Sequence, residues 1–361
     1  MLLDSNDLLL LRMIEQHRFV PLSALKRFAF SPSLTAAAHH LLFSKMTARF
    51  GKKGELLYFD ALSQRTLAQR SIPVRRTRNY TLDDPTPRRM ASYAEIALTA
   101  LRAGAGIAQA ASLNLHHSPS IMTSLPLRNQ KHRQMLNASQ CAAFAHWGDT
   151  VYMIFYVTGA SSGFHLAHEL ALFHALLPVF RLPPDIPLAL VFAGVSYKAI
   201  AYELNKKETE SKNKTMSYSK AYREAPVPVH LLSCDEVGAK QLAMMKHDGY
   251  RRLILNKLLG EGGWMPVTED WLDGYLNDCP LMLGADMDVG RVERFVRLGL
   301  QMHDIVSVVV LEEQFAVYDK LLPKVGVKLL SFQAEQLGEF GALHTPACEP
   351  VQTEAGAYIH V

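Results

Sequence analysis

Cysteine is scarce in this sequence. Only four of its 361 residues are cysteines, namely Cys141, Cys234, Cys279 and Cys348, and no two of them form a Cys-x-x-Cys pair. Disulfide-stapled scaffolds and zinc ribbons need closely spaced cysteines. We therefore expect reduced thiols, which are typical of a cytoplasmic protein, and no disulfide framework or zinc ribbon.

Long apolar runs are also missing, although 49% of the residues are hydrophobic. No segment reaches the roughly 20 uninterrupted apolar residues that a membrane-spanning helix needs. The leucine run at 8–11 is short and follows Asp4 and Asp7, which is not the charge pattern of a secretory leader. We expect a protein without a membrane partner, long enough for two or three domains with packed cores.

Motifs for nucleotide and metal chemistry are absent as well. No Gly-x-x-x-x-Gly-Lys-Ser/Thr occurs, and the glycine-rich segment 260–263 lacks the lysine of a phosphate-binding loop, so we expect a turn there. His165, His168 and Glu169 follow the order His-x-x-His-Glu, which is not the His-Glu-x-x-His of a zinc protease. With His174 they are better explained as the polar side of a helix, and we expect no cofactor.

The first 80 residues carry the signals of three short helices. Ser5–Asp7 supplies capping oxygens before the apolar run 8–14, and a second helix is expected over 21–28 with proline in its first turn. A third helix over about 31–48 begins with Ser-Pro, and Met46 belongs to its core-facing spacing.

A basic hairpin follows these helices. Two short extended runs, 47–50 and 55–59, flank the turn sequence Gly51-Lys52-Lys53-Gly54. Three helices followed by such a hairpin are the order of a winged helix-turn-helix, which places one helix in a DNA groove and the hairpin beside it. We therefore expect residues 1–80 to form a DNA-binding domain.

The charge distribution indicates the same function. Residues 1–80 contain 13 Lys and Arg against 5 Asp and Glu, a balance of +8, whereas residues 134–361 contain 19 against 26, a balance of −7. A modest whole-chain charge of +4 therefore conceals a basic front and an acidic rear. Such asymmetry is typical of a polyanion-binding part joined to a neutral or acidic body.

Candidate DNA contacts divide into base and phosphate contacts. Thr35 and His39 lie one turn apart on the outer side of the expected third helix and are candidates for base edges, although His39 and His40 are equally consistent with surface histidines. No Arg, Asn or Gln accompanies them, which favours recognition led by shape or by the hairpin. Phosphate contacts, which fix position and affinity, are assigned to Lys45, Arg49, Lys52, Lys53, Arg75 and Arg76.

One family shares this pattern. A Leu-rich helix ending in His17-Arg18-Phe19 is followed by Leu22–Leu25, a Ser-capped helix, and Tyr58–Ser63 before a short helix. In these features the segment 8–69 resembles the winged-helix part of the replication-relaxation family of conjugative plasmids and integrative elements. It departs from the family in having few arginines in the third helix.

The resemblance implies a setting and partners. It implies a role in origin-of-transfer processing, plasmid replication or transcription of transfer genes. The implied partners are double-stranded DNA and a relaxase or replication protein. A homodimer on a two-fold site is the usual geometry for such a protein.

A connector and an α/β body are expected behind the first domain. We assign residues 81–146 to a helical connector, with a cationic segment at 128–133 that either follows DNA or, as we favour, is a solvated loop. Residues 147–345 alternate between strands and helices, which favours one largely parallel α/β layer, and 346–361 are assigned to a C-terminal tail. The expected strands are 150–158, 187–193, 229–232, 304–311 and 327–331; the expected helices are 163–177, 196–205, one beginning near Cys234–Glu236, and 312–322.

The resemblance also implies that this body has a restriction-endonuclease-like core. Nuclease chemistry there needs acidic metal ligands on a strand and a nearby Glu-x-Lys. The expected strands 151–157 and 188–193 contain no acidic residue. We therefore expect a multidomain α+β or α/β protein without enzymatic activity.

Three alternatives remain open at this point. The first is a metal-dependent nuclease or hydrolase that uses Asp149, His165, His168 and Glu169. The second is a transcriptional regulator that senses a small molecule in its α/β body. The third is a pure interaction module, because winged helices also mediate protein contacts.

Overall fold

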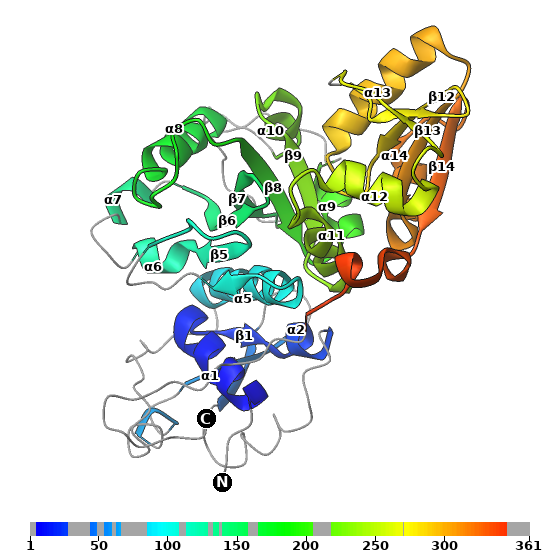
Figure 1. Cartoon of the computed structure of the whole chain (residues 1–361). Helices are drawn as coiled ribbons and strands as arrows, with labels where there is room; N and C mark the ends of the chain where they lie inside the picture. Colours follow the sequence, from blue (N-terminus) through cyan, green and yellow to red (C-terminus); the bar gives the residue numbers. More distant parts are fainter. Residues whose placement is uncertain are drawn as a thin grey trace. The chain divides into compact units, whose positions relative to one another are not determined.

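The computed structural model describes residues 5–27, 44–48, 54–59, 63–65, 85–107, 113–128, 133–136, 139–157, 165–204, 218–269 and 271–344 (Figure 1). The chain separates into two compact units, residues 1–102 with 344–361, and residues 103–343. We call these the N-terminal unit and the large unit. The boundary follows the helix that ends at Arg102, whereas the sequence suggested limits after residues 80, 146 and 345.

The N-terminal unit combines helices with a small antiparallel sheet. Its elements are α1 (Ser5–His17), β1 (Val20–Pro21), α2 (Leu22–Arg27), β2 (Ser44–Ala48), β3 (Gly54–Tyr58) and α5 (Pro85–Arg102). The sheet order is β1-β3-β2, and β3 runs antiparallel to both neighbours. Buried side chains of α1, β1, α2, β3 and α5 form its core, among them Met13, Val20, Leu25, Leu57 and Ile96.

The structure confirms a hairpin here but corrects its limits. Residues 44–48 form strand β2, not the end of a helix, because their backbone pairs with β3 from Ser44 opposite Tyr58 to Ala48 opposite Gly54. Met46 and Lys45 therefore belong to a strand. The second helix begins at Leu22, since Pro21 belongs to β1, which has only one neighbour and so tolerates a residue without an N–H.

The large unit contains two sheets rather than the one layer expected. The first has six strands in sequence order: β4 (Gly106–Ile107), β5 (Ser120–Thr123), β6 (Cys141–Trp147), β7 (Thr150–Tyr156), β8 (Leu188–Gly194) and β9 (Val229–Ser233). Strands β5, β6 and β7 form an antiparallel meander, and β7, β8 and β9 are parallel. The described helices with it are α6 (Ser124–Arg128), α7 (Arg133–Leu136), α8 (Leu166–Leu176), α9 (Tyr197–Leu204) and α10 (Tyr218–Glu224).

The expectation that residues 81–146 form a helical connector is wrong for much of that range. Helix α5 occupies its start, but β5 and β6 follow. Strand β6 has the sequence CAAFAHW and is buried over Cys141–Ala145. A strand buried on both faces shows no polar alternation, so period-2 patterning does not reveal it.

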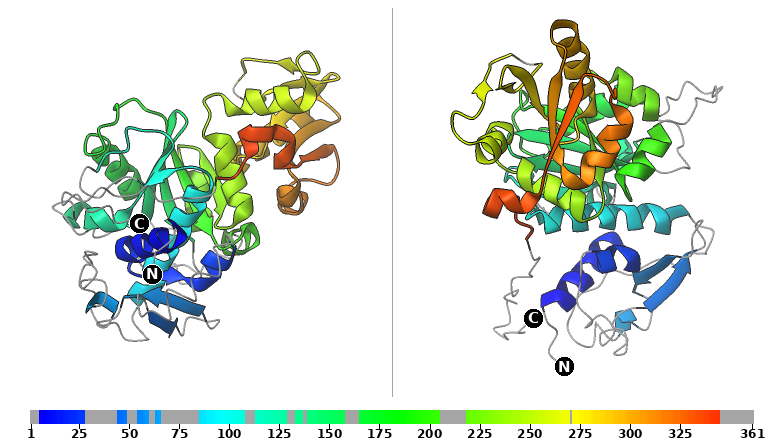
Figure 2. Two further views of the ribbon diagram at one scale, coloured as in Figure 1. Left: turned by 60° about the horizontal axis from the view of Figure 1, so that its bottom comes forward. Right: turned by 90° about the vertical axis from the view of Figure 1, so that its right-hand side faces the viewer.

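The second sheet has five strands and is covered on both faces. Its strands are β10 (Met265–Pro266), β11 (Gly274–Leu276), β12 (Cys279–Leu283), β13 (Val306–Leu311) and β14 (Val327–Phe332), of which the last three are parallel. Helices α11 (Glu236–Met245), α12 (Tyr250–Leu259), α13 (Val289–Met302), η1 (Glu312–Gln314), α14 (Phe315–Leu321) and η2 (Ala334–Gly341) surround it (Figures 1 and 2). Val308 packs with α13 and α14, whereas Val309 packs with α12 and η2, as period-2 alternation requires.

Backbone and buried side chains join the two sheets. The amide of Leu231 in β9 donates to the carbonyl of Met287, 3.1 Å away, in the loop between β12 and α13. The Gln241 amide of α11 donates to the carbonyl oxygens of Leu231 at 3.0 Å and Asp286 at 2.8 Å, and the Tyr197 hydroxyl donates to Gln241. These buried polar groups are hydrogen-bonded. The arrangement of the two sheets is therefore fixed by hydrogen-bond geometry as well as by packing.

None of the described helices is both long and apolar enough to cross a lipid bilayer.

Candidate functional site

The sequence-predicted DNA contacts fall mostly outside the described residues. Among the eight, the structure places only Lys45, in β2 of the hairpin. Thr35, His39, Arg49, Lys52, Lys53, Arg75 and Arg76 lie outside the described part of the chain. Their assignment to DNA therefore stays a prediction.

Three of these cations belong to the segment that connects the two strands of the hairpin. The last paired residues are Ala48 of β2 and Gly54 of β3. The five-residue segment between them, Arg-Phe-Gly-Lys-Lys, contains three cations and no acidic residue. A hairpin with such a connection is the kind of element that contacts phosphates beside a DNA groove.

The acidic and histidine cluster considered for metal binding is not assembled as a site. Glu169 of α8 is buried and accepts from the Ser139 hydroxyl at 2.6 Å and the Gln140 amide at 2.7 Å. Burial raises the pKa of Glu169, and these two hydrogen bonds oppose the rise. His168 is exposed on the same helix, His165 is exposed at its N-cap, and Asp149 is exposed in the β6–β7 turn. Across the described residues, no group of three His, Cys, Asp or Glu could hold a metal ion.

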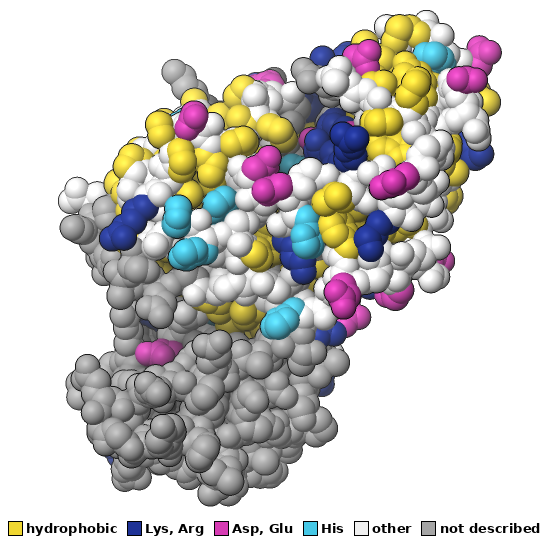
Figure 3. Space-filling model, in the orientation of Figure 1, with side chains coloured by type: hydrophobic (Ala, Val, Ile, Leu, Met, Phe, Trp, Pro, Cys, Tyr) yellow, Lys and Arg dark blue, Asp and Glu magenta, His cyan; other side chains and the backbone are white. Residues whose placement is uncertain are grey.

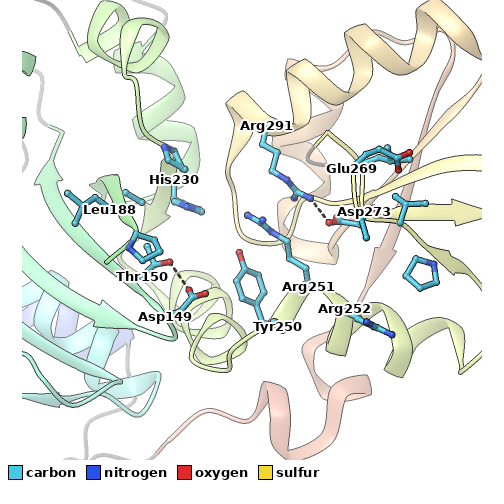
Figure 4. A pocket seen from close by; sticks show the side chains of 18 of the residues that line it. Asp149, Thr150, Leu188, His230, Tyr250, Arg251, Arg252, Glu269, Asp273 and Arg291 are labelled. Atoms are coloured by element: carbon cyan, nitrogen blue, oxygen red, sulfur yellow. Dashed lines mark hydrogen bonds and ion pairs between the residues drawn. The ribbon is translucent and has the colours of Figure 1, made fainter. Parts of the chain in front are cut away.

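A charged cavity lies where the two sheets of the large unit meet. Its volume is about 650 Å³, and residues of both sheets line it (Figure 4). On one side are Thr150, Leu188 and His230, near the amino ends of β7, β8 and β9. On the other side are Asp273 before β11 and Arg291 on α13, with the first turn of α12 between the two sides. On the face drawn in Figure 3, Lys and Arg side chains gather in the region where the sheets meet.

A buried carboxylate fixes the central arginine of this cavity. The Asp286 side chain is fully buried, and its Oδ2 accepts from Arg251 Nε at 2.9 Å, from Arg251 Nη2 at 2.7 Å and from the Tyr250 hydroxyl at 2.5 Å. Burial alone would raise the pKa of Asp286, but the Arg251 guanidinium, with Arg291 and the Tyr250 hydroxyl, holds it well below its usual value. Asp286 therefore stays ionised, and Arg251 is held in one orientation.

A buried histidine stands on the opposite wall. His230 is 4% exposed, and its Nδ1 lies 2.9 Å from the Asp286 carbonyl oxygen. A carbonyl oxygen only accepts, so Nδ1 must carry a proton. The ring also contacts Tyr152 edge-on, with centroids 5.6 Å apart. Within the described part of the chain, Nε2 of His230 has no hydrogen-bond partner.

A second ion pair closes the side formed by α13. Arg291 donates to the Asp273 carboxylate, and Asp273 Oδ2 accepts from the Leu283 amide at 2.8 Å. Asp288 caps α13 by accepting from the Arg291 amide at 3.1 Å. Arg291 is therefore fixed by both its backbone and its side chain.

The loop between β12 and α13 is strained at this point. Met287 is buried and has a φ of +56°, a conformation that side-chain-bearing residues rarely adopt. Such outliers cost about 1–3 kcal/mol and concentrate at functional sites. Asp286 and Asp288, the neighbours of Met287 in the chain, make the contacts described above.

Sequence reasoning missed this cavity. The signals available were an apolar run ending at Leu283, followed by Gly-Ala-Asp-Met-Asp, and the adjacent Arg251 and Arg252 after Gly249. Neither signal is a known motif. The two segments come together only where the two sheets meet, and those sheets are formed by different parts of the chain.

Comparison of the chain with protein-family models, with curated proteins and with solved structures gives no match. The structure itself defines a mixed α+β protein of two units, with three separate sheets among the described residues.

Proposed function

We propose that this protein binds duplex DNA through its N-terminal unit and serves as a non-enzymatic accessory or regulatory protein of a mobile genetic element. The observation that carries the proposal is the order α1, β1, α2, β2, β3 with the sheet order β1-β3-β2. This order of elements supports a winged helix, with β2 and β3 as the wing.

Charge supports the same assignment. The wing connection contributes Arg49, Lys52 and Lys53, and residues 1–80 have a balance of +8. Phosphate contacts by such cations supply most non-specific affinity and make binding depend on salt.

The six-stranded sheet supports a scaffold role for the large unit. Its meander β5–β6–β7 followed by parallel β8 and β9 is compatible with a restriction-endonuclease-like core. Strands β6 and β7 contain no acidic residue, and Glu169 is engaged by Ser139 and Gln140. We therefore favour a catalytically silent body that mediates dimerisation or contacts a relaxase or replication protein.

A binding-site selection with the intact chain tests the proposal. Purified protein is incubated with a random duplex pool at low ionic strength, and the retained fragments are sequenced over several rounds. We expect retention of duplex fragments and enrichment of a two-fold-related site. No retention of duplex at low salt would contradict the proposal.

A further inference from the structure

The cavity of the large unit has hydrogen-bond donors that the fold leaves unused. A guanidinium has five N–H donors, and Arg251 gives two of them to Asp286, which leaves three. Its side chain is 33% exposed, whereas that of Asp286 is 0% exposed, so the unused edge is on the open side. Arg252, the next residue, is exposed at the cavity and makes no ion pair with any described residue.

The start of α12 adds the positive end of the helix dipole to these arginines, while the amides of Tyr250 and Arg252 donate to the carbonyl oxygens of His247 and Gly249. Gly249 precedes the helix with a φ of +64° and provides no side-chain cap, and the first turn contains no acidic residue. Gly249, Tyr250, Arg251 and Arg252 all line the cavity. Helix amino ends attract anions, and an arginine fork matches a phosphate or carboxylate.

The same cavity has acceptors that an anion alone would not use. His230 is nine-tenths buried and lines the cavity, and its Nε2 has no hydrogen-bond partner among the described residues. Because Nδ1 faces the Asp286 carbonyl, Nε2 is the ring nitrogen left to hydrogen-bond with a ligand. Asp149 and Glu269 are exposed at the cavity and are acceptors too. A ligand must therefore offer hydrogen-bond donors as well as negative charge.

The remaining walls are apolar. Pro187, Leu188, Pro266 and Val267 line them. A volume of about 650 Å³ is within the range of pockets that hold a drug-sized molecule.

We propose that this cavity binds a phosphorylated small molecule with free hydroxyl groups, of the size of a sugar phosphate or a mononucleotide. The phosphate binds at the unused edge of Arg251 near the amino end of α12, and Arg252 adds positive charge at the rim of the cavity. The hydroxyl groups hydrogen-bond with His230 Nε2 and donate to the carboxylates of Asp149 and Glu269. A base or other ring packs against the apolar side chains that line the remaining walls. This goes beyond DNA binding and does not depend on it.

Calorimetric titration of the full-length protein, without DNA and at constant ionic strength, tests the site. The probes are ribose 5-phosphate and adenosine monophosphate, each matched to its unphosphorylated counterpart, ribose or adenosine. We expect each phosphorylated probe to bind at least tenfold more tightly than its counterpart. Binding of neither phosphorylated probe, or equal binding of adenosine and its monophosphate, would overturn the proposal.

Variants then locate the binding. Arg252→Ala removes an exposed cation, and Arg251→Lys keeps a positive charge beside Asp286 while removing the fork; each should weaken the phosphorylated probes roughly tenfold or more. Arg294→Ala is the matched control, because Arg294 is an exposed arginine of α13 outside the cavity. Equal losses in Arg294→Ala, or no loss in Arg252→Ala, would place the binding elsewhere and overturn the assignment.

A final arm identifies the source of the phosphate. A short single strand with a 5′-phosphate is compared with the same strand without it, in wild type and in Arg252→Ala. Arg252-dependent preference for the phosphorylated strand would show that a strand end enters the cavity. Preference confined to the free sugar phosphate or mononucleotide would show a small metabolite; both results support the site.

Discussion

Each of the two units contains a buried ionisable side chain, but one of these side chains is neutral and the other is charged. In the N-terminal unit, His17 is 1% exposed, and neither of its ring nitrogens has a hydrogen-bond partner among the residues that the structure describes. In the large unit, Asp286 is equally buried but is held by Arg251 and Tyr250. Burial lowers the pKa of His17 to about 3, so His17 stays neutral, whereas partners keep Asp286 charged. The difference shows that partners, and not burial alone, decide which charges a core retains.

The largest expected effect concerns Asp286. Asp286→Ala leaves the Arg251 guanidinium and the Tyr250 hydroxyl without their buried partner. Removing one side of a buried pair costs about 3–5 kcal/mol, so the large unit should unfold at markedly lower urea concentration. Fluorescence-monitored urea unfolding is suitable, because all three tryptophans, Trp147, Trp264 and Trp271, belong to this unit.

Asp248→Asn is the control for that experiment. Asp248 is exposed and lies two residues before Tyr250, so its loss should change stability by less than about 0.5 kcal/mol. Equal destabilisation by both variants would show that Asp286 has no special role.

The next prediction concerns the pH dependence of stability that His17 causes in the N-terminal unit. The folded pKa of His17 is lowered to about 3 from an ordinary value of 6.5, so the unfolded chain binds the extra proton first as pH falls. The N-terminal unit should therefore be fully stable above pH 6.5 and lose about 1.4 kcal/mol per pH unit below it, down to about pH 3. Hydrogen exchange of the α1 amides between pH 5 and 7, corrected for intrinsic rates, measures this loss.

His17→Leu should remove that pH dependence, because it replaces the ionisable ring with an apolar side chain. His116→Gln, at an exposed position of the large unit, is the matched histidine control and should leave it unchanged. If α1 in His17→Leu still weakens with the same slope, another group is responsible.

A smaller effect is expected at the link between α8 and the segment before β6. Ser139→Ala removes the hydroxyl that donates to Glu169 at 2.6 Å, which should cost about 1–3 kcal/mol because the carboxylate is buried. The change in the urea midpoint at constant slope measures it. A loss below 0.5 kcal/mol would mean that water replaces the hydroxyl and that the burial of Glu169 is not maintained.

The smallest expected effect distinguishes a structural role of α8 from a metal-binding role. His168 is exposed, so His168→Ala should change stability by less than about 0.5 kcal/mol and should not alter metal content. Elemental analysis of wild type and variant provides the check. Stoichiometric metal that disappears in His168→Ala would revive the hydrolase alternative.

Local patterns predicted many elements of the fold. The structure confirms strands near 150–158, 187–193, 229–232, 304–311 and 327–331 as β7, β8, β9, β13 and β14, and the helices between them as α8, α9, α11 and α14 with η1. Gly and Pro at their ends and β-branched runs such as Val306–Val310 supply those signals. Helices α12 and α13 and strands β4, β5, β6, β10, β11 and β12 are among the elements that were not predicted.

Long-range pairing could not be predicted in the same way. The division into two sheets depends on β9 meeting the loop at 284–288, which is a contact between distant segments with no pattern of its own. The Arg251–Asp286 pair spans 35 residues and exists only after both sheets form. For the same reason, the sequence provided the hairpin of the N-terminal unit but not the cavity of the large one.

The most direct test of the central claim compares two double variants in a salt titration of duplex binding. Lys52→Ala with Lys53→Ala removes two cations from the wing connection, and Arg294→Ala with Arg297→Ala removes two exposed cations from α13. If the wing contacts phosphates, the slope of log K against log salt should fall by about two only in the first variant. An unchanged slope in the first variant, or an equal fall in both, would contradict DNA binding by the N-terminal unit.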